Sequence, residues 1–115
     1  MSSTGPMQQL SCIVLDKDTF LKKLLSSFIS KTEGVTELSD ADLSKADVLF
    51  VDAALYEGDY MLGLNPATQV VVVSANNIFI KALFDKEIAD FLPKSEITYD
   101  KFLESVSKVR NTLSA

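Results

Sequence analysis

Histidine is absent from this chain of 115 residues, and it has a single cysteine, Cys12. The absence of histidine removes the commonest general base, histidine-containing catalytic triads and most zinc sites. One cysteine forms no disulfide within the chain and no paired-cysteine metal or redox motif. Because Cys12 lies in the apolar run 10–15, we expect its thiol to be buried and chemically inert.

Glycine and proline are also scarce, with four glycines and three prolines. The glycines, at positions 5, 34, 58 and 63, are too widely spaced to form a glycine-rich phosphate-binding loop. No apolar run is long enough to span a membrane, and residues 1–9 do not resemble a signal peptide. We expect a flexible tail at 1–9, one domain at 10–115 and a cytoplasmic location.

Acidic residues outnumber basic ones by 16 to 11, which gives a net charge of −5 at pH 7. The lysines and arginines are dispersed and form no basic stripe, so direct binding to nucleic acid is not expected. A hydrophobic fraction of 47% together with 23% charged residues is typical of a globular domain and argues against disorder.

Short apolar runs alternate with segments of helical periodicity. The runs predict five strands, the second of them weak, at Leu10–Leu15, Val35–Leu38, Asp47–Val51, Gln69–Val73 and Ala89–Pro93. After the first run, apolar residues at helical spacing predict a helix that begins at Asp18 or Thr19 and stops near Gly34. Its apolar stripe comprises Phe20, Leu21, Leu24, Leu25, Phe28 and Ile29.

The later connections are less regular. Two helical turns are expected at Ser39–Ala46, and at most a short helix at Asp59–Leu64. A helix capped by Asn76 or Asn77 extends to Ile88, and a last one runs from Thr98 to Leu113.

Alternating strands and helices predict an α/β fold with a doubly wound, five-stranded parallel sheet. We expect the flavodoxin-like strand order 2-1-3-4-5, right-handed crossovers, and shortened second and third connections. Pro93 suits an edge strand, because proline has no N–H to donate to a neighbour.

Polar residues follow the predicted strands directly. Asp16, Lys17 and Asp18 come after the first strand. The third strand is followed by Asp52, the fourth by Ser74 and the fifth by Lys94. Sites in such sheets lie at the carboxyl ends of the strands. We therefore expect two carboxylates, a hydroxyl and an ammonium to converge there.

From Leu10 to about Arg110 the chain resembles the receiver domain of bacterial two-component response regulators. The likeness rests on the segments IVLDKDTFLKKLLSSFI, DVLFVD, VVVVSA and DFLPKS. The C-terminal half is most similar to receivers that precede LytTR-type output domains. This resemblance implies that Asp52 accepts a phosphoryl group, with Asp16 and Asp52 holding Mg²⁺, Lys94 binding a phosphoryl oxygen, and Ser74 and Phe91 acting as switch residues.

The same resemblance implies the partners. A histidine kinase or phosphotransfer protein would donate the phosphoryl group, and the domain would signal through protein contacts. It would not be an enzyme beyond phosphorylation and dephosphorylation of its own Asp52. We expect a homodimer or output partner to bind the face formed by the helix from Asn77, the strand at Phe91 and the final helix to Leu113. Apolar residues in excess of one buried stripe after Asn77 support this face.

Three residues depart from the receiver pattern. Lys17 replaces the second acid after the first strand, while Tyr56 and Ser95 stand where proline is usual. A lysine next to Asp16 and Asp52 predicts weak or absent Mg²⁺ binding, because two carboxylates are few and an ammonium repels the metal. Two arrangements remain open: Lys17 pairs with the carboxylates, or it turns to solvent and Asp18 supplies the missing oxygen.

Two alternatives to a phosphoacceptor follow from these residues. The first is a pseudo-receiver, a phosphorylation-independent interaction module that has kept the fold and lost the metal. The second is a cofactor-binding protein on a flavodoxin-like sheet. The acidic sequence Asp16-Lys17-Asp18 disfavours the second, because a phosphate cradle after the first strand requires a Ser, Thr or Gly loop.

Overall fold

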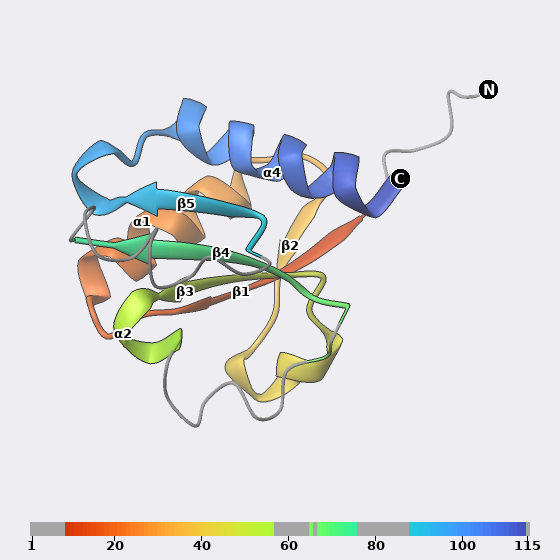
Figure 1. Cartoon of the computed structure of the whole chain (residues 1–115), viewed down its shortest axis with the longest axis horizontal. Helices are drawn as coiled ribbons and strands as arrows, with labels where there is room; N and C mark the ends of the chain where they lie inside the picture. Colours follow the sequence, from red (N-terminus) through yellow and green to blue (C-terminus); the bar gives the residue numbers. More distant parts are fainter. Residues whose placement is uncertain (1–8, 57–64, 66, 76–87, 115) are drawn as a thin grey trace.

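The computed structural model describes residues 9–56, 65, 67–75 and 88–114 (Figure 1). Five strands form one parallel sheet in the order β2-β1-β3-β4-β5. The strands are β1 (Leu10–Leu15), β2 (Val35–Glu37), β3 (Val48–Asp52), β4 (Gln69–Ser74) and β5 (Asp90–Pro93). The predicted fold class and strand order are confirmed, and Pro93 is indeed in an edge strand.

The helices in the described residues are α1 (Thr19–Ser30), η1 (Asp40–Lys45), α2 (Ala53–Tyr56), η3 (Lys94–Glu96) and α4 (Tyr99–Ser114). The two turns expected at Ser39–Ala46 form a 3₁₀ helix, with the Ser39 side chain accepting a hydrogen bond at its start. The predicted helices at 59–64 and after Asn76 lie outside the described residues, and so does the predicted tail apart from Gln9.

Side chains cap the two long helices. Asp18 Oδ1 accepts the N–H of Leu21 at 3.2 Å, and Thr98 Oγ1 accepts the N–H of Lys101 at 3.2 Å. The predicted stop at Gly34 is wrong in detail, because α1 ends at Ser30. Gly34 has φ 82° and lies in the turn that leads into β2, where glycine adopts a left-handed conformation without strain.

Apolar side chains pack on both faces of the sheet. On one face, α1 and α4 cover the strands, and Phe102 stacks on Phe50 with ring centroids 5.5 Å apart. On the other face, a second cluster joins strand residues to Leu43 of η1 and to Ala53 and Leu55 of α2. Figure 1 shows α4 running along the β5 side of the sheet. No helix in the described residues is long and apolar enough to cross a membrane.

The predicted apolar stripe of α1 is correct except at its first member. Leu21, Leu25, Phe28 and Ile29 are buried against the sheet, whereas Phe20 is 74% exposed. Phe20 lies in the first turn, one residue and thus about 100° around the helix from Leu21. It therefore falls outside the arc that the sheet covers.

Candidate functional site

The register of the sheet places the predicted polar residues at one edge. Leu15 pairs with Val51, so Asp16 lies beside Asp52 in the neighbouring strand. Asp52 pairs with Val73, and Ser74 pairs with Pro93, which immediately precedes Lys94. The carboxyl ends of β1, β3, β4 and β5 are therefore level, as the sequence predicts.

Lys94 connects the two carboxylates. Its Nζ donates to Asp52 Oδ2 at 2.6 Å and to Asp16 Oδ1 at 3.3 Å, and it lies 3.2 Å from Asp16 Oδ2. The side chains of Lys94 and Asp52 are 18% and 20% exposed, and that of Asp16 only 3%. Three residues far apart in sequence thus form one partly buried, charged cluster.

Asp16 is the most deeply placed member of this cluster. Its Oδ1 accepts the N–H of Asp18 at 2.8 Å, while Oδ2 has no hydrogen bond to any described residue and is held by the charge of Lys94 alone. Burial raises the pKa of Asp16 above its ordinary value, and the hydrogen bonds from Asp18 and Lys94 offset only part of that effect.

The surroundings of Lys94 favour its charged form. Burial alone would lower its pKa, but the hydrogen bonds and charges of Asp52 and Asp16 outweigh burial and raise it. The ammonium therefore stays charged at neutral pH. A fixed cation beside Asp52 suits any chemistry in which negative charge accumulates on that carboxylate.

Ser74 and Phe91 lie near the cluster without being part of its ion pairs. Ser74 ends β4 and is 4% exposed, so its hydroxyl belongs to the buried end of the sheet. Phe91 in β5 is half-buried and packs against the apolar cluster that contains Leu49 and Val72. Their predicted switch roles stay predictions.

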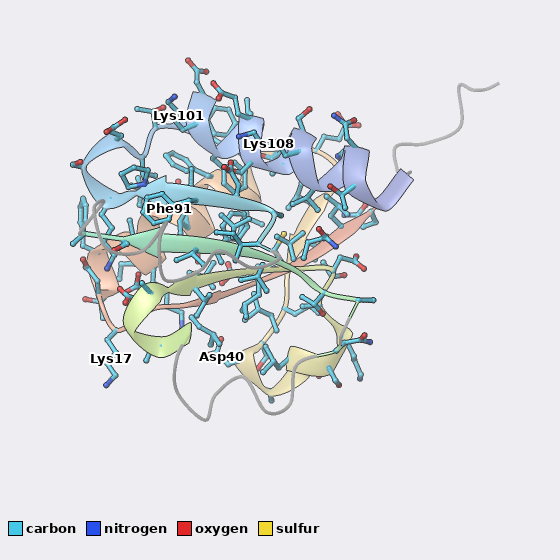
Figure 2. The ribbon with its side chains drawn as sticks, in the orientation of Figure 1. Lys17, Asp40, Phe91, Lys101 and Lys108 are labelled. Atoms are coloured by element: carbon cyan, nitrogen blue, oxygen red, sulfur yellow. The ribbon has the colours of Figure 1, made fainter. Side chains whose placement is uncertain are left out.

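Lys17 turns to solvent, as in the second of the two arrangements that the sequence left open, but the substitution by Asp18 that belonged to that arrangement is not found. Its side chain is exposed and forms no ion pair with any described residue, and Figure 2 shows it pointing away from the body of the molecule. The pairing considered for Lys17 with Asp16 and Asp52 is made by Lys94 instead. Asp18 does not replace the missing acid, because its carboxylate caps α1.

The donor set does not fit a firm magnesium site. Asp16 and Asp52 are the carboxylates at the cluster, and both are bound to Lys94. Among the described residues, no group of three or more acidic, cysteine or histidine side chains is placed to hold a metal ion. Mg²⁺ prefers six oxygen ligands in a regular octahedron, and an ammonium between its two carboxylates opposes that arrangement.

A second feature lies on the far side of β5. A small cleft of about 90 Å³ runs between this edge strand and α4. Asp90 anchors the helix beside it, accepting hydrogen bonds from Ser105 Oγ at 2.6 Å and Lys108 Nζ at 3.1 Å. Lys101 and Lys108 flank the cleft (Figure 2). The part of the predicted partner face that the structure describes, Phe91 and α4, borders this cleft, and the helix from Asn77 lies outside the described residues.

Comparison with solved structures identifies the architecture. The response regulator domain of Thermotoga maritima CheB superposes with a TM-score of 0.64 at 18% identity, covering 94% of this chain and 98% of that one. The RcsB response regulator of Salmonella typhimurium gives 0.67 at 17% identity, with 94% and 68% covered. The chain has the fold of a receiver domain.

A structure that is not named as a response regulator also matches this chain. A pilus assembly protein, CpaE from Caulobacter crescentus, matches with a TM-score of 0.62 at 13% identity over 90% of this chain and 95% of its own. No protein-family model and no curated protein sequence matches the chain. At these identities the receiver fold is established, and the function rests on the residues at the strand ends.

The sequence identified all members of the cluster but not their connectivity. It assigned Lys94 to a phosphoryl oxygen and considered Lys17 as the partner of the carboxylates. Lys17 directly follows Asp16, and adjacency in a loop does not determine where a side chain points. Lys94 is 78 residues from Asp16 along the chain, so the strand order predicted that the two residues converge but not that Lys94 is the lysine that pairs with the carboxylates.

Proposed function

We propose that this protein is a response regulator receiver domain that accepts a phosphoryl group on Asp52 from a histidine kinase or phosphotransfer protein. The observation that carries the proposal is the bridge from Lys94 to Asp52 and Asp16 at the carboxyl edge of the sheet. A carboxylate at this edge with a fixed neighbouring cation is suited to phosphoryl transfer, in which positioning and charge stabilisation provide most of the catalysis.

In the proposed reaction, a carboxylate oxygen of Asp52 forms a bond to phosphorus. The phosphorus–nitrogen bond of the donor's phosphohistidine breaks, and the electron pair stays on the histidine nitrogen. Lys94 then balances charge on the new acyl phosphate, while Ser74 and Phe91 respond to it as switch residues. Mg²⁺ binding is weak or absent, so the ammonium supplies the positive charge. The domain acts in the cytoplasm and is not an enzyme beyond turnover of its own phosphate.

The signal leaves the domain through protein contacts. The cleft between β5 and α4, together with the helix that the sequence predicts from Asn77, is the surface we propose for a homodimer or output partner. The resemblance of the C-terminal half to receivers of LytTR-type regulators suggests the class of regulator to which the domain belongs. Neither direct binding to nucleic acid nor membrane insertion is part of the proposal.

Incubation with acetyl phosphate, followed by intact-protein mass spectrometry, tests the phosphoacceptor. We expect one phosphoryl group to accumulate slowly on the wild-type protein, because Mg²⁺ binding is weak, and none on Asp52→Asn. The matched control is Asp100→Asn, which alters an exposed aspartate in the first turn of α4 and should be phosphorylated like the wild type. Phosphorylation that persists in Asp52→Asn would contradict the assignment.

The second candidate is a pseudo-receiver that acts through protein contacts without phosphorylation. Two observations favour it: the second acid is replaced by an exposed lysine, and the cluster does not fit a firm metal site. This candidate predicts no phosphoryl adduct in the wild-type protein with either acetyl phosphate or a phosphorylated histidine kinase. The same mass measurement therefore separates the two functions.

A further inference from the structure

The ammonium of Lys94 lies between the only two carboxylates that the described strand ends bring together at this edge. It contacts Asp52 at 2.6 Å and both oxygens of Asp16 at 3.2 and 3.3 Å. A divalent cation shared by the same carboxylates would compete with this ammonium for Asp52 Oδ2 and the oxygens of Asp16. We propose that Lys94 is the resident cation of the site and that it excludes divalent metal. The inference concerns the site of the proposed function but does not depend on phosphorylation.

The charges of the cluster support a resident lysine. Two carboxylates and one ammonium leave one net negative charge, whereas adding a divalent cation without removing the lysine would leave a net positive charge. All three side chains are at least four-fifths buried, so water screens these interactions less than it does on an open surface. The charge of Lys94 therefore opposes entry of a metal for as long as Lys94 keeps its short hydrogen bond with Asp52.

Within the part of the chain that the structure describes, Asp18 does not offer a substitute ligand. Asp16 Oδ1 is held by the N–H of Asp18, and the Asp18 carboxylate is engaged with the N–H of Leu21 at the start of α1. Recruiting Asp18 to a metal would uncap that helix. Lys17, by contrast, is exposed and unpaired among the described residues, so the structure assigns the exclusion of metal to Lys94 and not to Lys17.

Loss of Lys94 should create a metal site. With Lys94 removed, Asp16 and Asp52 present two carboxylates at one edge, and Mg²⁺ or Mn²⁺ is commonly bound by one or two carboxylates together with water. We expect Mn²⁺ to bind Lys94→Met at least about tenfold more tightly than the wild type. Even a third of the repulsion between unit charges about 4 Å apart corresponds to that factor.

Titration with Mn²⁺, followed by the electron paramagnetic resonance signal of the free ion, measures the binding without any phosphodonor. The proteins compared are the wild type, Lys94→Met, and Lys94→Met combined with Asp16→Asn. Lys101→Met, which changes an exposed lysine of α4, is the control. We expect the gain in Lys94→Met alone. The double variant should lose the gain, and Lys101→Met should match the wild type.

Tight Mn²⁺ binding by the wild type, or equal affinity in the wild type and Lys94→Met, would overturn the proposal. If Lys94→Met does not fold, Lys94→Gln replaces it, because the amide still donates a hydrogen bond but carries no charge. Failure of Asp52 to accept phosphate would refute the proposed function and leave this metal titration unaffected.

Discussion

Asp16 has the least exposed side chain of the three residues in the charged cluster. Its side chain is 3% exposed and one of its oxygens has no hydrogen bond among the described residues, so burial raises its pKa despite the ion pair with Lys94. A raised carboxyl pKa means that the folded state binds a proton more readily than the unfolded state. At neutral pH, the ionised carboxylate therefore lowers the free energy of unfolding.

Asp16→Asn is accordingly expected to raise the melting temperature at pH 7, because it removes a buried charge that the folded state disfavours. The wild type should gain stability as the pH falls through the raised pKa of Asp16, and its difference from the variant should shrink there. Thermal unfolding across a pH series measures both effects. A lower melting temperature for Asp16→Asn at pH 7 would show that the carboxylate stabilises the fold.

Cys12 is a second buried group with a clear consequence. Burial, together with the negative charges of Asp47 and Glu37, raises the pKa of its thiol to about 12. We expect the folded protein to resist a thiol reagent such as dithionitrobenzoate at pH 8 and to react fully in denaturant. Stability from the neutral thiol should be lost as the pH rises above the ordinary value of 9.0. Rapid labelling of the native protein would contradict the expected burial.

At the level of elements, the start of α1 depends on one side chain. Asp18 caps the helix through Leu21 while its own N–H holds Asp16. Asp18→Ala should lower the free energy of unfolding by about 1 kcal/mol, the usual value for loss of an N-cap. Lys17→Ala, the adjacent control, changes an exposed residue and should stay within about 0.5 kcal/mol of the wild type. Urea denaturation compares the two, and equal losses would show that the cap is not the cause.

Most elements were predictable because their signals are local. Every strand except the weak β2 contains a short apolar run, and the stripe from Leu21 to Ile29 has helical spacing. Periodicity identifies the apolar side of α1 but not how wide an arc the sheet covers, so it wrongly included Phe20. Gly34 likewise marked a break in the chain but not whether it ended the helix or turned the loop that follows.

For the site, the positions of the residues were predictable but their pairing was not. Asp16, Asp52, Ser74 and Lys94 were predictable as neighbours because parallel strands bring their carboxyl ends to one edge. Which cation pairs with the carboxylates depends on side-chain directions and on contacts across the whole chain. The sequence does not give side-chain directions, so Lys17 was considered as the partner of the carboxylates. In the structure that partner is Lys94.

At the scale of the whole molecule, Phe102 links the last helix to the sheet. It is fully buried and contacts Phe28 of α1 and Phe50 of β3, with ring centroids 5.7 and 5.5 Å apart. Phe102→Ala should cost about 3–5 kcal/mol, the range for truncating a buried phenylalanine. Chemical denaturation measures the loss, with Leu103→Ala, a half-buried neighbour, as the milder comparison. A loss below about 1 kcal/mol would mean that α4 contributes little to the core.

The position of Phe102 also affects how the domain forms during synthesis. The ribosome releases β1, β2 and β3 early, and these three strands are adjacent in the finished sheet. The face that they share with α1 has no cover from α4 until Phe102, nearly the last apolar core residue, has emerged. Until α4 has been synthesised, the nascent domain therefore exposes the part of this apolar face that α4 later covers. Folding of this domain should complete only after its final helix leaves the exit tunnel.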